Sequence, residues 1–189
     1  MIGDHCTSVL ADAYVKGIRG FDIRKAYEAM RKNAFEQPSP HDYLDGKGRR
    51  ALSSYLRYGY IPLEDSVKEA FHQQEQTSRT LEYAYDDYAT ALVAHELGDK
   101  KNEKLLRKHS LNYKNLFDAS TGFWRGKVIR DGKPLWIEDF RPNYPYYQYM
   151  YREADAWNSL FFAPHDPKGM VALYPSKRAV EQKLDSLFN

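Results

Sequence analysis

The chain has 189 residues, a length typical of one domain with a buried core. Its 28 basic and 26 acidic residues nearly balance, which argues against a nucleic-acid partner, and no apolar run approaches the ~18 residues of a membrane span. Aromatic residues make up 15% of the chain. Their rings either pack between helices or contact polar ligands, and composition alone favours packing. Cys6 is the single cysteine, so no internal disulfide forms.

The N-terminal part of the chain carries three helical patterns. We predict a first helix over residues 4–16 and a second over 23–34, where Asp22 is the cap and the apolar residues recur on one face. Prolines and glycines predict a loop over residues 37–49. A third helix over residues 51–56 follows this loop.

The clearest predicted unit is an antiparallel pair of helices in the middle of the chain. The first helix begins at Thr77 or Ser78 and stops at Gly98, and Asp99 caps the second helix. Because the link between them is only a couple of residues long, the two helices must lie side by side.

In the C-terminal part the spacing of apolar residues changes from that of helices to that of strands. Residues 123–129 and 135–140 flank an Asp-Gly dipeptide, which predicts a β-hairpin. A loop rich in tyrosine and proline over residues 141–152 leads to a helix predicted from Glu153, which a proline interrupts. A last helix is predicted from Ser176.

Two clusters of polar residues lie on the predicted helices. Asp4 and His5 stand at the start of the first helix, where aspartate is also an ordinary cap. The other cluster lies on the first helix of the antiparallel pair and consists of Arg79, Glu82, Asp86 and Asp87. A buried structural ion-pair network explains it as well as a functional site does, and an oxygen-ligand metal site needs carboxylates from elsewhere.

A third cluster combines carboxylates, a tryptophan and a histidine in a short stretch; its members are Glu153, Asp155, Trp157, His165 and Asp166. A carboxyl group packed beside Trp157 would lose solvation of its charged form, which raises its pKa toward the range of a general acid. The alternative is that Glu153 and Asp155 simply lie at a helix N-terminus, where negative charge is favoured. The residues alone support both interpretations equally.

Several stretches, in this order along the whole chain, resemble the glycoside hydrolase family 92 α-mannosidases. The matching stretches are Met-Ile-Gly-Asp-His at residues 1–5, residues 9–14, 21–27, 78–87, 112–118 and 121–123, Pro-His-Asp at 164–166 and the ending at 184–188. Residues 1–5 and 78–87 are the most specific of them.

The resemblance implies a two-domain enzyme with an N-terminal β-sandwich, a C-terminal (α/α)6 toroid and a site between them. We therefore expect residues 1–189 to be a partial segment of the toroid. The segment should be mainly α, built of helical hairpins with one small inserted β-hairpin. The β-sandwich domain, its intramolecular partner, and the C-terminal part of the toroid should lie outside it.

The resemblance also implies an activity: calcium-dependent exo-α-mannosidases that invert the anomeric centre of a mannose-containing glycan. Glu153 matches the Glu of an E-G-N-A-W-Q-Y-type motif, the general acid of the family. Asp4 and His5 match a G-D-H segment that is expected to line the sugar pocket. Trp157 and Asp155 are expected to bind substrate beside the acid.

The chain also departs from the family pattern. Ala154 and Asp155 replace a Gly and an Asn after the acid, and Asn158 and Ser159 replace a Gln and a Tyr. The family's catalytic base and calcium ligands lie in G-N-D-D-type and H-G-N-E-P-type motifs that these 189 residues lack. We therefore expect no metal site in this segment, calcium ligands outside it, and no mannosidase activity from this chain alone.

Export to the periplasm or outside the cell is typical of such enzymes, and is expected of the parent enzyme; we expect no signal peptide within this segment. Two other functions fit the residues. One is a helical-toroid glycosidase or lyase that acts on a different sugar, and the other is a non-catalytic helical module that binds carbohydrate.

Overall fold

The computed structural model describes residues 2–66, 74–143 and 150–189. Its helices are α1 (Cys6–Val15), α2 (Ile23–Phe35), α3 (Pro40–Leu44), α4 (Leu52–Tyr58), α5 (Gln76–Glu96), α6 (Lys100–His109), the 3-10 helix η1 (Asn112–Leu116), α7 (Pro167–Val171) and α8 (Lys177–Phe188). The strands are β1 (Phe117–Asp118), β2 (Phe123–Trp124), β3 (Lys127–Arg130) and β4 (Lys133–Trp136). The prediction of a mainly helical protein is confirmed.

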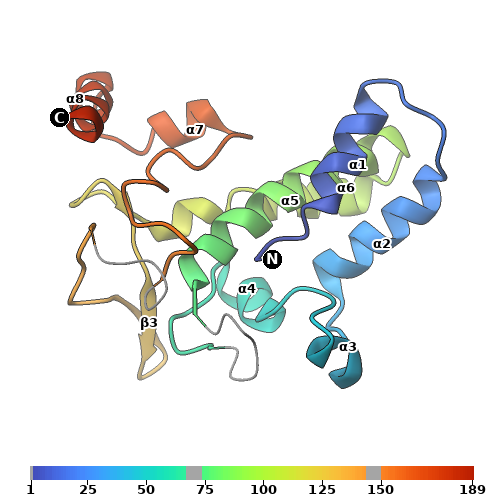
Figure 1. Cartoon of the computed structure of the whole chain (residues 1–189), viewed down its shortest axis with the longest axis horizontal. Helices are drawn as coiled ribbons and strands as arrows, with labels where there is room; N and C mark the ends of the chain where they lie inside the picture. Colours follow the sequence, from blue (N-terminus) through green and yellow to red (C-terminus); the bar gives the residue numbers. More distant parts are fainter. Residues whose placement is uncertain (1, 67–73, 144–149) are drawn as a thin grey trace.

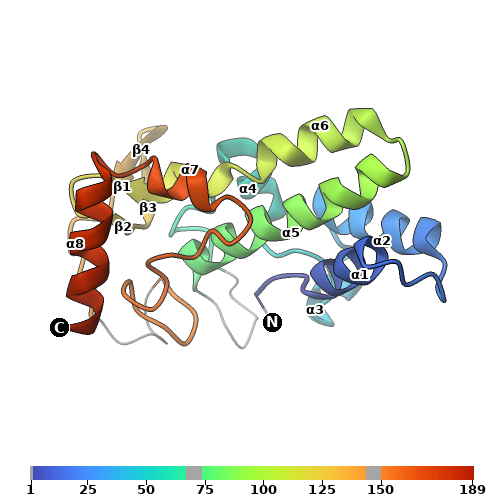
Figure 2. The ribbon, with the colours of Figure 1, turned by 90° about the horizontal axis from the view of Figure 1, so that it is seen from above.

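Helix α5 forms the centre of the molecule. It runs through the middle in both ribbon views, with α1 and α2 along one side and α6 along another (Figures 1 and 2). Side chains on nearly all sides of α5 are buried, including the charged Asp86 and Asp87. A helix covered all round in this way holds its polar side chains in fixed positions.

The antiparallel pair α5–α6 forms where the sequence predicts it. Gly98 has the left-handed backbone (φ +77°) that ends α5, and the carboxylate of Asp99 accepts the backbone N–H of Asn102 at 3.1 Å. The hydroxyl of Tyr27 also donates to Asp99 Oδ2 at 2.9 Å. One side chain therefore caps α6 and ties α2 to the pair.

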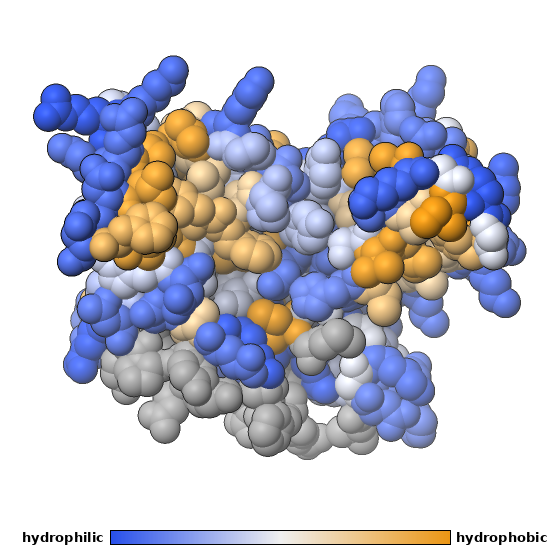
Figure 3. Space-filling view, turned by 45° about the horizontal axis from the view of Figure 1, so that its top comes forward, coloured by the Kyte–Doolittle hydropathy of each residue, from blue (hydrophilic) through white to orange (hydrophobic). Residues whose placement is uncertain are grey.

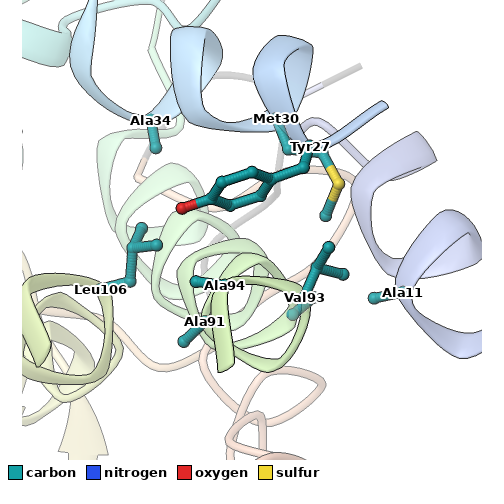
Figure 4. Close-up of a cluster of buried hydrophobic side chains, with 9 residues drawn as sticks. Ala11, Tyr27, Met30, Ala34, Ala91, Val93, Ala94 and Leu106 are labelled. Atoms are coloured by element: carbon teal, nitrogen blue, oxygen red, sulfur yellow. The ribbon is translucent and has the colours of Figure 1, made fainter. Parts of the chain in front are cut away.

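The largest apolar cluster lies where α1, α2, α5 and α6 meet (Figure 4). Alanines on α5 allow close approach of the neighbouring helices, while larger side chains come from the helices around it. The cluster consists of Ala11, Tyr27, Met30, Ala34, Ala89, Ala91, Val93, Ala94 and Leu106. It fixes the N-terminal helices against the half of α5 that lies beyond Asp87.

The β structure differs from the expectation of one hairpin, because the described residues contain two antiparallel pairs. Strands β3 and β4 pair around the Asp131-Gly132 turn, as predicted, with Val128 opposite Leu135. Strands β1 and β2 form the second pair, closed by Gly122 in the left-handed region (φ +69°). Each strand of that pair has two residues, which is too short to produce a period-two pattern in the sequence.

Two other predicted elements also differ. Residues 40–44 of the predicted loop form the short helix α3, because the Ser39 hydroxyl caps it by accepting the backbone N–H of Asp42 at 3.1 Å and Pro40 fits the first helical position. The helix predicted from Glu153 does not form; the chain makes turns there. Glu153 has a left-handed backbone (φ +47°), so it is not itself a helical residue.

The ends of the molecule carry apolar side chains that other residues do not cover. None of the residues of α8 is buried, and Leu184 and Phe188 on it are exposed, as are Val9 and Val15 on α1. Figure 3 shows apolar side chains gathered both on the side of α7 and α8 and on the side of α1. Within the described ranges no helix combines the length and apolar character that crossing a membrane requires.

Candidate active site

A buried arginine joins two parts of the chain that are far apart in sequence. The Arg49 guanidinium, 1% exposed, donates from Nε to Asp4 Oδ1 at 2.9 Å and from Nη1 to Asp87 Oδ1 at 2.6 Å. Asp4 lies just before α1, Arg49 just before α4 and Asp87 in the middle of α5. This pairing places the Asp4 carboxylate in a fixed orientation beside α5.

Tyr55 completes the surroundings of Asp87. Its hydroxyl donates to Asp87 Oδ2 at 2.9 Å, and His109 Nδ1 lies 4.0 Å from the same oxygen. Complete burial raises the pKa of Asp87 to about 6, although Arg49 and the Tyr55 hydrogen bond act in the opposite direction. Asp87 is therefore ionised at neutral pH and holds Arg49 in place.

Asp86 behaves differently from its neighbour. Its Oδ2 accepts the backbone N–H of Asp4 at 2.8 Å, while its buried Oδ1 has no partner among the described residues. Burial, followed by the negative charge of Asp4, raises the pKa of Asp86 to about 9. Burial would also raise the pKa of Asp4, but the charge of Arg49 together with the hydrogen bonds to the carboxylate keeps that pKa below its ordinary value. At neutral pH, Asp4 is charged and Asp86 is neutral.

Gly3 allows this close approach of the N-terminal segment to α5. A Cβ at this position would lie 2.6 Å from His5 Cε1, 2.9 Å from Asp86 Oδ2 and 3.1 Å from Glu82 Cβ. Any other residue would push the segment away from the helix. The Gly-Asp-His order thus has a steric cause: Gly3 makes contact possible, and Asp4 and His5 then face α5.

Two cavities lie on either side of the Asp4–His5 segment. One, of about 300 Å³, is lined by Asp4, Arg49 and His5 among other residues. The other, of about 420 Å³, lies between His5, Glu82 on α5 and the segment that carries Arg152. Both volumes fall in or near the range of about 300–1,000 Å³ that is usual for small-ligand sites. His5 lines both cavities.

The predicted acid Glu153 lies beside this second cavity but does not line it. Its side chain is 56% exposed, and its Oε1 forms an ion pair with Arg152 Nη2 at 2.8 Å. Its neighbours Arg152 and Ala154 do line the cavity. The packing of a carboxyl group against Trp157, which the sequence suggested, is therefore not how the structure places Glu153.

The other two predicted substrate residues have structural contacts. Asp155 Oδ1 accepts the backbone N–H of Asn158 at 2.9 Å, which closes a turn. Trp157 contacts Phe123 edge to face, with ring centroids 4.8 Å apart, and Lys183 Nζ lies 4.7 Å from its ring centroid. Half of the aromatic loop over 141–152, at residues 144–149, lies outside the described residues.

The His-Asp pair of the third cluster supports the fold. His165 Nε2 lies 2.8 Å from the carbonyl oxygen of Ser110, within hydrogen-bond distance. Asp166 caps α7 by accepting the backbone N–H of Gly169 at 2.9 Å, and it accepts the Tyr113 hydroxyl at 2.7 Å. These contacts hold the 150–166 segment against the rest of the molecule.

Sequence reasoning found Asp4, Asp86 and Asp87 but missed Arg49 and Tyr55. Arg49 lies in a segment predicted as a loop, and Tyr55 lies on an apolar helix face where tyrosine ordinarily packs. The available signal was the combination of three aspartates with a pair of arginines, Arg49 and Arg50, between a glycine-rich segment and a helix. Buried carboxylates require such a partner.

No three His, Cys, Asp or Glu side chains are arranged to hold a metal ion in the part of the chain that the structure describes. The carboxylate oxygens of Asp4 and Asp87 are used by Arg49, and Asp86 is neutral at neutral pH. These residues do not fit a calcium ion.

Acid–base hydrolases typically have carboxyl groups beside a cavity whose pKa values differ, so that one group carries a proton while another is ionised. The chain belongs to glycosyl hydrolase family 92, because the model of this family's catalytic domain matches residues 1–189. A relative from Arthroderma benhamiae, described as an uncharacterized secreted glycosidase, is 31% identical over 98% of this chain and 26% of its own length.

Two solved structures from Bacteroides thetaiotaomicron are similar in fold and sequence. The family GH92 α-mannosidase BT3965 matches with a TM-score of 0.83 and 33% identity, over all of this chain and 22% of its own. The GH92 inverting mannosidase BT2199 matches with a TM-score of 0.81 and 30% identity, over 98% of this chain and 23% of its own. The chain thus spans about a quarter of these relatives.

Proposed function

We propose that this chain is part of the catalytic domain of an inverting exo-α-mannosidase that hydrolyses terminal α-linked mannose. The observation that carries the proposal is its similarity, over its whole length, to the α-mannosidase BT3965. The inverting mechanism is proposed from the similarity to BT2199, which is described as an inverting mannosidase. As with its fungal relative, export from the cytoplasm to the periplasm or the medium fits this function.

In the proposed mechanism Glu153 protonates the glycosidic oxygen as the bond from that oxygen to the anomeric carbon of mannose breaks and the rest of the glycan departs. An inverting enzyme needs a second carboxylate about 6.5–9.5 Å away, which activates a water on the opposite face of the sugar. We propose that this base comes from outside these 189 residues. The ion pair with Arg152 orients Glu153, and the exposed side chain of Glu153 leaves room for a substrate to approach.

We propose that Asp4 and His5 bind the mannose, with Asp155 and Trp157 close to Glu153. Asp4 suits this role because Arg49 keeps it ionised and fixed, so that its carboxylate accepts hydrogen bonds from sugar hydroxyls without reorganising. His5 lines both cavities, so a sugar in either one meets its ring.

We propose that other parts of the enzyme, outside these 189 residues, complete the site. Residues 1–189 form a segment of the helical (α/α)6 domain, and the rest of the toroid and a β-sandwich domain supply the missing walls of the site. Calcium, which would polarise the substrate, binds to ligands outside this segment. No step of the mechanism above passes through it.

The experiment uses a protein that carries this chain together with the remaining length typical of the family. Glu153→Gln should lower kcat at least 100-fold on an α-mannoside with a poor leaving group, because the amide cannot donate the proton. The matched control is Glu138→Gln, whose carboxylate is exposed on the surface. Release of mannose at the wild-type rate by the Glu153 variant would overturn the assignment of the acid.

The same assay tests the segment hypothesis. The 189-residue chain supplied with calcium should release no mannose, because it lacks a carboxylate positioned as base. Measurable release from that chain would contradict it. Screening the longer protein on other glycosides separates an α-mannosidase from a toroid enzyme with a different sugar.

A further inference from the structure

We propose that the cavity of about 420 Å³ beside Glu82 is a monosaccharide-binding subsite in which the Glu82 carboxylate accepts hydrogen bonds from vicinal sugar hydroxyls. The ligand class is a neutral hexose unit of a glycan. This inference rests on the proposed function in one respect, which is that the sugar is mannose. It adds a residue, Glu82, to which the family resemblance assigned no role.

The lining of the cavity has the two kinds of surface that a sugar ring requires. Polar groups come from three segments of the chain, and an apolar floor comes from α5 and from residues 154–162. The polar lining residues are His5, Ser78, Glu82, Arg152, Asn158 and Ser159, and the apolar ones are Ile2, Leu81, Ala154 and Phe162. Apolar surface combined with convergent polar groups is what a small-ligand site uses to hold and orient its ligand.

Within this lining Glu82 stands out because no other described residue donates a hydrogen bond to its carboxylate. Its side chain is only 19% exposed, and its one ion-pair contact among the described residues is long, at 3.8 Å to His5 Nδ1. Asp86 and Asp87, on the next turn of α5, both receive hydrogen bonds. The Glu82 carboxylate lines the cavity with its acceptor sites open, and a bound ligand with hydroxyl groups can donate to them.

Arg152 connects the cavity to the proposed acid. Arg152 lines the cavity, and its Nη2 forms an ion pair with Glu153. A sugar held against Glu82 and His5 would therefore lie next to the group that is proposed to protonate the glycosidic oxygen. The cavity is in the right place to be part of the substrate path.

Protonation of Glu82 should control binding. Burial raises its pKa to about 7. The charged and titratable groups around it come from the N-terminal segment, from α5 and from the 150–163 segment; they are Asp4, His5, Arg79, Asp86 and Arg152. Because the ionised form accepts hydrogen bonds from two hydroxyls, binding should be strongest above pH 7 and weaken below it.

The experiment measures binding rather than turnover. Methyl α-mannoside is titrated into the protein between pH 5.5 and 8.5, and the Kd is obtained from NMR chemical shifts. For Glu82→Gln we expect the Kd at pH 8 to increase about tenfold and its dependence on pH to disappear. Glu96→Gln, the same change at the exposed end of α5, is the matched control and should bind as wild type.

A second measurement covers the case in which Glu82→Gln does not fold, which far-UV circular dichroism detects. Carbon-13 labelling of glutamate in the wild-type protein reports the Glu82 carboxyl directly, and its pKa should fall when methyl α-mannoside binds. An unchanged pKa in the saturated protein overturns the proposal. So does an unchanged Kd in a folded Glu82→Gln variant, or no binding by the wild type at any pH in the range.

Failure of this proposal and failure of the proposed function give different results. If the longer protein releases mannose while the Glu82 variant binds and turns over as wild type, the enzyme assignment stands and the subsite is wrong. If methyl α-mannoside binds at Glu82 but no α-mannoside is hydrolysed, the subsite stands and the hydrolase assignment is wrong.

Discussion

Arg49 is the residue on which the arrangement of the carboxyl groups depends. It neutralises two carboxylates that come from opposite parts of the chain, Asp4 and Asp87, and it is itself buried. Taking the three charges out of water costs free energy, and only their short mutual contacts offset that cost. Removal of the arginine would leave Asp87 buried and charged among apolar and aromatic side chains.

We therefore predict that Arg49→Met destabilises the protein by about 3–5 kcal/mol, since breaking a buried ion pair leaves an uncompensated charge. Urea unfolding followed by circular dichroism measures the free energy of unfolding. Arg107→Met is the matched control, because Arg107 pairs with Glu103 on the surface of α6 and should change that free energy by less than about 1 kcal/mol. Equal effects of the two changes would show that the Arg49 contacts contribute little.

At the residue scale the sequence predicted half of this arrangement. Asp4, His5, Asp86 and Asp87 were identified by their spacing and by the Gly-Asp-His segment. Arg49 was not identified, because it follows Asp4 by 45 positions and no local pattern connects a loop arginine to a distant helix. Long-range charge pairing is fixed by the tertiary packing of α5, which periodicity does not encode.

At the scale of helices and strands, the predictions that are confirmed are those that depend on residues close together in the sequence. The α5–α6 pair was predicted because Gly98 and Asp99 act within a few residues of their own positions. At the helix predicted from Glu153, Asp155 and Asn158 bond to each other's backbone N–H as at a helix start, but the chain then continues in turns. Both residues are also ordinary at a helix start, so composition did not distinguish the two outcomes.

Helix α8 tests how much an element depends on its neighbours. The prediction from Ser176 is confirmed, and the Ser176 hydroxyl accepts the backbone N–H of Ala179 at 3.1 Å. Its contact with the rest of the molecule includes Lys183, which donates to the Thr121 carbonyl at 3.0 Å and lies 3.3 Å from the Phe123 ring centroid. With no buried residue, α8 has little apolar burial to hold it.

We predict that hydrogen exchange separates α8 from α5. Amides of α8 should exchange with an opening free energy of about 0–2 kcal/mol, because a helix without buried side chains opens locally. Amides in the middle of α5 should exchange only through global unfolding. Helix α6 is the control: it has a similar length, but Leu106 is buried against α5, so its protection should exceed that of α8. Equal protection of α8 and α5 would contradict this.

At the scale of the whole molecule, the buried acids and histidines make stability depend on pH in opposite directions. Burial raises the pKa of Asp86 to about 9, of Glu82 to about 7 and of Asp87 to about 6, so in those ranges the folded protein binds more protons than the unfolded chain. The free energy of unfolding then falls as pH rises. Burial lowers the pKa of His109 and His165, which has the opposite effect below about pH 6.5.

These opposing effects separate above pH 7, where the histidines are neutral in both states and Asp86 still carries its proton in the folded state. The free energy of unfolding should therefore fall by about 1–2 kcal/mol between pH 7 and 8.5, since one proton released on unfolding corresponds to about 1.4 kcal/mol per pH unit. Asp86→Asn replaces the neutral acid by an isosteric amide and should flatten the curve. Asp12→Asn, at an exposed pair with Lys16, should keep the fall. Urea unfolding at several pH values measures the free energy of unfolding of each protein. A wild-type free energy that stays level or rises between pH 7 and 8.5 would mean that Asp86 is ionised in the folded protein.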